Sequence, residues 1–306
     1  MTVSLVSTLY KSAPFVDGFV ARCLALMGPE DELILVDDGS PDNSLALARA
    51  HAAIDPRITV VELARNFGHH VAILAGLSQA RGERVFFVDS DLEEAPELLT
   101  EFATVMDANG VDVVFGIHDH SHGSLLRKAT SRAFWRFFNW ASDNATPLNI
   151  CNVRLMSRRY VDALVSLPES NVFLGGMFHW VGFRQIGIPI ERRPRSTDST
   201  YSILARVALA VRSVISFSTA PLKGMFLLGT IISTFSALLA VYFVVLKIVD
   251  PTIQVGFTAL IISIWFLSGI IIACLGVIGI YLAYMYTETK RRPRVVVRDV
   301  FRAKKP

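Results

Sequence analysis

Cysteine is scarce in this chain of 306 residues, and the three cysteines, Cys23, Cys151 and Cys274, have no spacing typical of a disulfide framework or a zinc site. We therefore expect all three to be reduced and structural. The N-terminus also lacks the basic segment and the long apolar core of a secretory signal peptide. This predicts that the first domain stays in the cytoplasm.

Charge is almost absent from long stretches of the last third of the chain. Between Lys223 and Lys247 lie 23 uncharged residues. As a helix they would reach about 34 Å, enough to cross a hydrocarbon core of about 30 Å. A second uncharged stretch follows closely. The pattern predicts transmembrane helices at 222–248 and 254–287; the alternative is a buried helical hairpin in a soluble protein.

Acidic residues are nearly absent from the C-terminal tail. Residues 290–306 contain eight Lys or Arg and a single acid, Asp299, whereas the connection 248–254 contains no basic residue. The positive-inside rule therefore predicts that both ends of the helical pair lie in the cytoplasm. We expect a juxtamembrane amphipathic helix at 201–221. The basic tail at 288–306 is expected to contact anionic membrane lipid at roughly 1 kcal/mol per basic residue, solvated surface being the simpler alternative.

Residues 1–117 alternate short apolar runs with helix-like segments. Strands that alternate with helical crossovers predict an α/β domain with a largely parallel, doubly wound sheet. The expected strands are Val3–Val6, Leu33–Val36, Ile58–Leu63, Val85–Val88 and Val111–Phe115, and the expected helices lie near 14–27, 44–54, 70–81 and 96–109. Ligands of such sheets bind beyond the carboxyl ends of the strands.

Three polar motifs follow expected strands at that edge: Asp37-Asp38-Gly39-Ser40, Arg65-Asn66-Phe67-Gly68 and Asp89-Ser90-Asp91. Asp89 and Asp91 are two residues apart, so their carboxylates point to the same side of an extended chain and can bind one hard cation. Mg²⁺ uses few protein carboxylates and completes its shell with water and phosphate oxygens, and the same use is expected of Mn²⁺. The motif therefore predicts a metal–diphosphate site.

The other two motifs are less specific by themselves. Asp37 and Asp38 can accept hydrogen bonds from a nucleobase or a ribose hydroxyl, but Asp-Gly turns are common and most are only structural. Arg65 is equally ambiguous alone. His69 and His70 directly follow the motif that ends at Gly68, and they are expected to cap or pack the following helix.

Aromatic and basic side chains are interleaved in residues 124–140. This composition is typical of a helix that lies in the membrane interface. The alternative is a helix packed on the sheet, with its arginine stems extended toward water.

Five segments occur in the order VDDGS, ARNFGHHVAILAGLSQARGERVFFVDSDLEEAPELL, RLMSRRYVDAL, WVGFRQ and SFSTAPL. Over nearly its whole length the chain thereby resembles family 2 glycosyltransferases of the polyprenyl-phosphate type. These include bacterial undecaprenyl-phosphate glucosyl- and aminoarabinosyltransferases and the dolichol-phosphate mannose synthases. The resemblance implies a GT-A catalytic domain at 1–200. It also implies inverting transfer of a sugar from a nucleotide sugar, expected to be a UDP-sugar, to undecaprenyl phosphate.

The resemblance extends to cofactor, partners and location. It implies Mg²⁺ or Mn²⁺ as cofactor, membrane lipid as a partner, and a homo-oligomer that binds no nucleic acid. The bacterial plasma membrane is the expected location, and modification of cell-envelope glycans is the expected purpose.

Site residues carry over by motif. The resemblance implies that Asp37, Asp38, Arg65 and Asp89 bind the nucleotide, and that Asp89 and Asp91 hold the metal and the diphosphate. The family's Arg-x-x-x-Ser arrangement for the lipid phosphate is matched by Arg127 and Ser131. A second pattern, Arg-x-x-Gly-x-Ser-Lys-Tyr, is matched in part by Arg195, Ser199 and Tyr201, because threonines replace its Gly and Lys.

The chain departs from the family in one segment near the expected chemistry. Many relatives have Asp-x-Gly-Asp-Phe-Arg-Leu where this chain has amides at both acidic positions, Asn149 and Asn152. No general base can be assigned there. A lipid monophosphate, with a second pKa of about 6, is already anionic at neutral pH and needs positioning more than deprotonation. Asn152 is expected to orient an acceptor oxygen or a sugar hydroxyl.

Two other functions would use the same kind of domain. A processive polysaccharide synthase typically has more membrane helices and a Gln-x-x-Arg-Trp motif, but none of the four tryptophans here follows an arginine. A membrane scaffold without turnover would be consistent with Asn149 and Asn152. The intact Asp89–Asp91 pair favours an enzyme instead.

Overall fold

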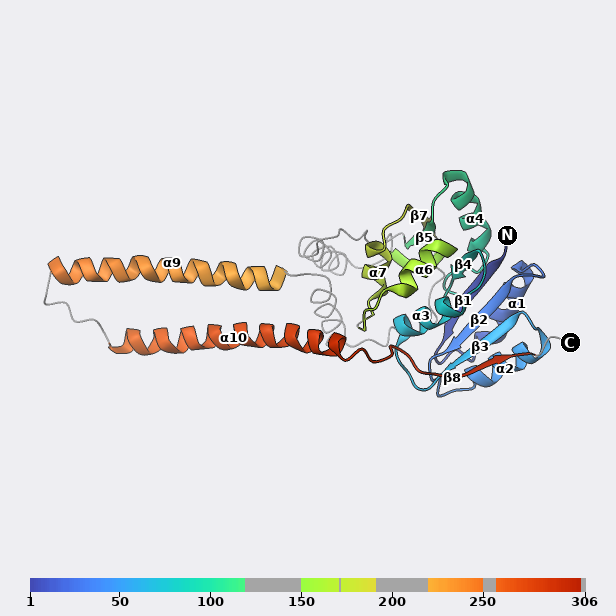
Figure 1. Cartoon of the computed structure of the whole chain (residues 1–306), viewed down its shortest axis with the longest axis horizontal. Coiled ribbons are helices and arrows are strands. Elements are labelled where there is room, and N and C mark those ends of the chain that lie inside the picture. Colours follow the sequence, from blue (N-terminus) through green and yellow to red (C-terminus); the bar gives the residue numbers. More distant parts are fainter. Residues whose placement is uncertain (119–149, 171, 191–219, 250–256, 304–306) are drawn as a thin grey trace. The chain divides into compact units, whose positions relative to one another are not determined.

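The computed structural model describes residues 1–118, 150–170, 172–190, 220–249 and 257–303 (Figure 1). These residues fall into two compact units. An α/β unit contains the described residues up to 190 together with those from 292 onward, and a helical unit contains the two long C-terminal helices.

The α/β unit is built on an eight-stranded sheet with the order β7-β5-β6-β4-β1-β2-β3-β8. Strands β1 to β4 are parallel, β7 is parallel to β5, and β6 is antiparallel to both β4 and β5. The strands are β1 (Val3–Leu9), β2 (Glu32–Asp37), β3 (Ile58–Leu63), β4 (Arg84–Phe87), β5 (Val113–His118), β6 (Ile150–Ser157), β7 (Gln185–Ile190) and β8 (Val297–Arg302). The expected mostly parallel α/β architecture is confirmed.

Helical crossovers connect the first five strands, as the sequence predicts. The helices of this unit are α1 (Val16–Leu26), α2 (Ser44–Ile54), α3 (His69–Gln79), α4 (Leu98–Asn109), α6 (Arg158–Ser166) and α7 (Leu174–Trp180). The central strands are mostly apolar because both of their faces are covered, and all six residues of β3 are buried, including Thr59 and Glu62. This packing fixes the strand ends from which the polar motifs emerge.

Three strands of the sheet were not predicted: β6, β7 and β8. Strand β6 contains the amide-substituted segment, and β8 lies within the basic tail, where only a membrane contact was expected. β8 pairs antiparallel with β3 and forms one edge of the sheet. The chain therefore returns to the sheet after its two long apolar helices.

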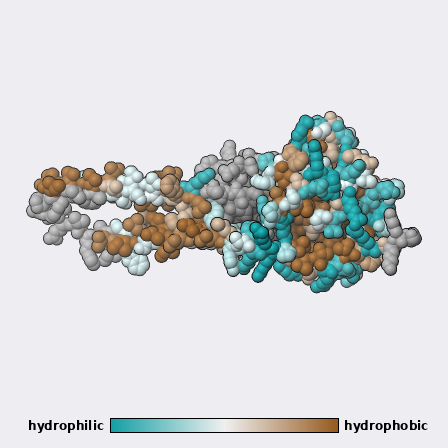
Figure 2. All heavy atoms as spheres, in the orientation of Figure 1, coloured by the Kyte–Doolittle hydropathy of each residue, from teal (hydrophilic) through white to brown (hydrophobic). Residues whose placement is uncertain are grey.

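The helical unit contains α9 (Ala220–Val249) and α10 (Phe257–Thr289). Both are long and apolar enough to cross a membrane, and their membrane-length windows have mean hydropathies of 1.6 and 2.4 with 0% of the residues buried. Figure 2 shows the hydrophobic side chains along both helices. The two expected apolar helices are confirmed. The helix expected at 124–140 lies outside the described residues, as does the helix expected at 201–221 except for its last two residues, which belong to α9.

Candidate active site

The three sequence motifs come together at the carboxyl edge of the parallel strands. Asp37 is the last residue of β2, the Arg65 loop follows β3, and Asp89 lies two residues beyond β4. Strand β1 separates β4 from β2, so the Asp89 motif and the other two motifs lie on either side of it. The carboxyl ends of the strands, at the point where the strand order reverses, are the usual ligand site of an open α/β sheet.

The first motif holds the second in place. The Oδ1 atom of Asp38 accepts a hydrogen bond from the backbone nitrogen of Phe67 at 2.7 Å, and Oδ2 accepts one from that of Gly68 at 3.0 Å. Gly39 has a φ of +66°, and a Cβ atom there would lie 2.7 Å from the backbone nitrogen of Asn66. Only glycine permits this close approach of the two loops.

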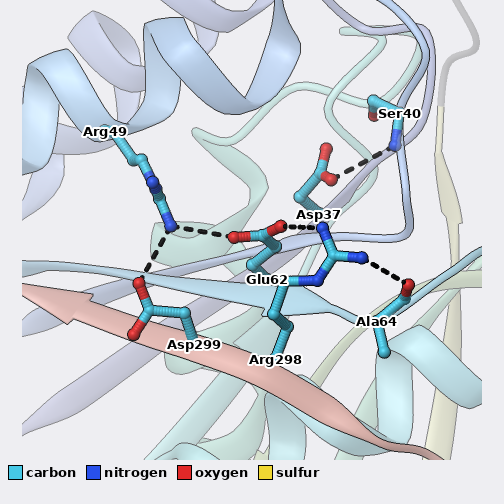
Figure 3. A network of polar contacts seen from close by, with 7 residues as sticks. All are labelled: Asp37, Ser40, Arg49, Glu62, Ala64, Arg298 and Asp299. Atoms are coloured by element: carbon cyan, nitrogen blue, oxygen red, sulfur yellow. Dashed lines mark hydrogen bonds and ion pairs between the residues drawn. The ribbon is translucent and has the colours of Figure 1, made fainter.

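Asp37 is placed differently from its neighbour. Its side chain is buried, and its Oδ2 atom accepts a hydrogen bond from the Ser40 backbone nitrogen at 3.2 Å (Figure 3). Among the described residues, no group forms a hydrogen bond with its buried Oδ1 atom. Burial raises the pKa of Asp37 above its usual value, whereas the hydrogen bonds from Ser40 oppose that rise. A buried acceptor without a partner suits a ligand N–H or O–H group.

Arg65 lies exposed beside this pair. Its guanidinium carbon is 4.2 Å from the centre of the Phe67 ring, and its Nη1 atom donates to the Asn66 carbonyl at 3.0 Å. The cation is therefore held against the loop by an aromatic face and a carbonyl. It remains available to a negatively charged ligand at the same edge.

The Asp89 motif carries a concentration of negative charge. Asp89 keeps a side-chain exposure of 25%, and Glu93 and Glu94 are each 7% exposed nearby. Burial, together with the nearby carboxylates of Glu94 and Asp91, raises the pKa of Asp89 to about 8. The site disfavours a second negative charge unless a cation compensates it.

Oxygen ligands in this arrangement fit Mg²⁺ or Mn²⁺. Within the described ranges there is no group of three or more His, Cys, Asp or Glu side chains placed to hold a metal. Two carboxylates, Asp89 and Asp91, are sufficient for a cation whose other ligands are water and phosphate oxygens. Asp91 also accepts a hydrogen bond from the Glu93 backbone nitrogen at 3.1 Å, and Leu92 between them has a φ of +61°. A non-glycine residue in this region is strained, which is frequent at functional sites.

His69 belongs to the site, although the sequence predicted only capping or packing for it. It begins α3, and its Nδ1 atom lies 3.1 Å from Oγ1 of Thr8. Its Nε2 atom lies 3.1 Å from Nδ2 of Asn152 and 3.4 Å from Oδ1 of Asp89. Burial lowers the pKa of His69, which favours the neutral ring. The sequence gives no period or spacing that would have revealed this contact between α3 and β6.

Asn152 lies within the same cluster. Its side chain forms a hydrogen bond with Asp89, and it comes from β6, which is antiparallel to β4. The amide therefore lies against the first acid of the Asp-x-Asp motif. The expected lipid-phosphate residues, Arg127, Ser131, Arg195, Ser199 and Tyr201, and also Asn149, lie outside the described residues.

The fold has a counterpart among solved structures. The UDP complex of glucosyl-3-phosphoglycerate synthase from Mycobacterium tuberculosis superposes with a TM-score of 0.50 at 19% sequence identity, over 70% of this chain and 79% of that one. At this identity the likeness concerns the fold alone.

Relatives of known sequence match over almost the full length. The chain is 38% identical over 304 residues to a protein of Mycobacterium tuberculosis named among putative glycosyltransferases, covering 98% of this chain and 89% of that protein. It is 29% identical to the bactoprenol glucosyl transferase of Shigella phage SfV, covering 98% and 99% of the two chains. The family profile described as Glycosyl transferase family 2 matches residues 4–164. The chain belongs to glycosyl transferase family 2.

Proposed function

We propose that this protein transfers a sugar from a nucleotide sugar to polyprenyl phosphate, with undecaprenyl phosphate as the acceptor. The observation that carries the proposal is the meeting of three groups at one sheet edge in a chain of this family. These groups are the unpartnered Oδ1 of Asp37, the Arg65 loop held by Asp38, and the Asp89–Asp91 pair. Together they supply an acceptor for a base or ribose, a cation for phosphate, and oxygen ligands for a metal.

The acceptor rests on two further observations. Relatives that match over the full length carry the name bactoprenol glucosyl transferase, and α9 and α10 are long and apolar enough to cross a membrane. A polyprenyl phosphate keeps its chain in the bilayer, so an enzyme that uses it must work at the membrane surface. Arg127, Ser131, Arg195, Ser199 and Tyr201 are the proposed ligands of its phosphate.

The reaction needs one bond to form and one to break. An oxygen of the acceptor phosphate attacks the anomeric carbon of the sugar, and the bond from that carbon to the diphosphate oxygen breaks, which releases nucleoside diphosphate and inverts the anomeric centre. The acceptor is already ionised at neutral pH, so Asn152 has no proton to remove. Its proposed role is to orient a reacting oxygen or a sugar hydroxyl, together with His69.

A divalent cation has a defined place in this proposal. Asp89 and Asp91 would hold Mg²⁺ or Mn²⁺, which when bound neutralises the charge that develops on the leaving diphosphate. Arg65 adds a fixed positive charge at the same edge. Asp37 and the loop held by Asp38 orient the nucleoside, so that the sugar is presented toward Asn152.

We further propose that the sheet and both ends of the helical pair lie in the cytoplasm, at a bacterial plasma membrane. Because β8 belongs to the same sheet as β1 to β7, the chain leaves the sheet before α9 and returns to it after α10. This connection supports placing both ends of the helical pair on one side of the bilayer. The proposed segments are the catalytic domain at 1–200, a juxtamembrane helix at 201–221, spans at 222–248 and 254–287, and the tail at 288–306.

The test is transfer by the purified full-length chain in detergent. UDP-glucose and a panel of other nucleotide sugars are supplied with Mg²⁺ or Mn²⁺, with and without undecaprenyl phosphate, while nucleoside diphosphate and lipid-linked product are measured. We expect release that depends on the lipid phosphate and a product carrying one sugar. A growing polysaccharide would indicate a processive synthase, and absence of release with every donor would indicate a scaffold.

A further inference from the structure

The strand β8 contains an irregularity beside the candidate donor site. Its pairing with β3 is regular from Thr59 opposite Arg302 to Glu62 opposite Asp299. The next pair joins Leu63 to Val297, so Arg298 is one residue more than the ladder requires. Such a β-bulge re-aims a side chain and is frequent near functional sites.

At the bulge, the side chain of Arg298 contacts the buried carboxylate of Glu62. Its Nη1 atom donates to Oε1 of Glu62 at 2.9 Å, and Nη2 of Arg49 donates to Oε2 of the same carboxylate at 2.8 Å (Figure 3). Arg49 also donates to Oδ2 of Asp299 at 2.9 Å. Glu62 is only 8% exposed. Each oxygen of the Glu62 carboxylate therefore accepts a hydrogen bond from one arginine. One of these two arginines, Arg298, comes from the C-terminal strand.

Arg298 also holds the base of the Arg65 loop. Its Nη2 atom donates to the Ala64 carbonyl at 3.0 Å, and the Ala64 backbone nitrogen donates to the Val296 carbonyl at 2.9 Å. Ala64 directly precedes Arg65. Val296 and Arg298 thus contact both polar backbone atoms of the residue that precedes this loop.

The same network reaches Asp37. Glu62 is the cross-strand partner of Asp37 in the β2–β3 ladder, and its charge contributes to the raised pKa of Asp37. A cation on Glu62 reduces this repulsion. Arg298 is therefore linked to two parts of the candidate donor site: the charge around Asp37 and the position of Arg65.

We propose that Arg298 is a positioning residue for the nucleoside diphosphate part of the donor. It acts through Glu62 and Ala64 and touches no substrate itself. Residues that follow the membrane-length helices thereby set the affinity of the donor site. The inference rests on the proposed function, because it assumes that the donor binds at this sheet edge.

The experiment compares Arg298→Ala, Arg298→Lys and Arg302→Ala in the full-length chain in detergent. Arg302 is the matched control, since it is an exposed arginine at the other end of β8. For each protein we measure the dissociation constants of UDP and GDP, kcat, the KM of donor and of acceptor, and the melting temperature. The pair between Arg298 and Glu62 is partly exposed, with 62% and 11% of the side chains accessible, so the measurements use low salt.

We expect Arg298→Ala to raise the dissociation constant of the nucleotide and the donor KM about fivefold, because the effect of one charged contact is partly lost. The kcat and the acceptor KM should change less than about twofold. Arg298→Lys should recover part of the affinity, because lysine restores the charge on Glu62 but lacks the fork that also reaches Ala64. Arg302→Ala should resemble the wild type.

Arg298→Ala could lower the melting temperature and leave the nucleotide affinity unchanged. That result would overturn the proposal, since Arg298 would then only stabilise the edge strand β8. Glu62→Gln is a second probe, and its effect should be less than additive with that of Arg298→Ala; full additivity would also contradict the proposal. A wild type that binds UDP or GDP but transfers no sugar would contradict the proposed function and leave the Arg298 comparison intact. A wild type that binds neither nucleotide would overturn both.

Discussion

The Nε2 atom of His69 lies 3.1 Å from the Nδ2 atom of Asn152, although 83 residues separate them in the chain. The other ring nitrogen is held by Thr8 at 3.1 Å, so the imidazole is fixed at both ends. When Nδ2 of Asn152 donates to Nε2, the proton of the neutral ring lies on Nδ1 and is donated to Thr8. This leaves the carbonyl oxygen of Asn152 in one defined direction.

Replacing His69 by Ala should lower kcat about tenfold, because one positioning hydrogen bond of about 1–1.5 kcal/mol is lost at the reacting centre. The donor KM should change little, since the ring nitrogens of His69 contact Thr8, Asn152 and Asp89. Steady-state kinetics check this, with His51→Ala as the control because His51 pairs with exposed Asp17 away from the site. A donor KM that rises while kcat is preserved would instead place His69 in nucleotide binding.

Asp37 and Asp38 should respond differently to substitution by Asn. Asp37→Asn should weaken UDP binding about tenfold, because it changes the unpartnered buried oxygen that would accept from the ligand. It should not lower the melting temperature, because it removes a charge that burial disfavours. Asp38→Asn should cost about 1–3 kcal/mol of stability, since an amide nitrogen cannot accept from the backbone of Phe67 or Gly68. Thermal melts and calorimetric titration with UDP distinguish them. Equal behaviour of the two variants would contradict their separate roles.

The third prediction concerns the proposed metal ligands Asp89 and Asp91. Asp89→Asn and Asp91→Asn should each reduce transfer roughly a hundredfold or more at saturating Mg²⁺ or Mn²⁺, because metal stabilisation of a leaving diphosphate contributes several kcal/mol. Asp162→Asn is the matched control, since that carboxylate pairs with Arg158 within α6. Near-normal turnover in either site variant would show that the pair does not hold the metal.

Much of this fold follows from the apolar pattern, and the success has a physical reason. The predicted bounds of β3 and α2 agree with the structure at every residue. A strand such as β3, which is covered on both faces, is recognised by its mostly apolar residues. The C-terminal helices are equally plain, since few structures other than membrane spans use such long uncharged stretches.

The parts that were missed depend on contacts between distant residues. At the start of β8, Val295-Val296-Val297 precedes Arg298-Asp299-Val300-Phe301, and Val297 is the first residue of the strand. The basic composition of the tail nevertheless favoured a membrane contact over a strand. Arg298 pairs with Glu62, which is 236 residues away in the chain. The role of His69 likewise depends on a strand, β6, that was not predicted. Such pairings have no local sequence signal.

The raised pKa of Asp89 predicts a pH effect in the absence of metal. Its folded-state pKa of about 8 lies above its ordinary value of 3.8. Between these values the folded chain retains a proton that the unfolded chain has lost, so the free energy of unfolding falls as pH rises. In chelator, the melting temperature should be a few degrees lower at pH 8 than at pH 6. Mn²⁺ should restore stability at pH 8, and Asp89→Asn should remove both effects; a metal-free wild type that is equally stable at both pH values would contradict the assignment.

Strand β8 also protects an edge. All six residues of β3 are buried, and β8 pairs with five of them, so a chain that ends before α9 would expose an unpaired apolar strand. We expect residues 1–219 alone to aggregate on size-exclusion chromatography and to bind UDP more weakly than the full chain. The matched comparison joins residues 1–219 to 292–306 through a flexible Gly/Ser linker, which removes the apolar helices but keeps the strand. This version should elute without aggregates and bind UDP as the full chain does, because the Arg298 contacts to Glu62 and Ala64 are retained. If the shorter protein is equally soluble and binds UDP equally well, β8 contributes neither to edge protection nor to the donor site.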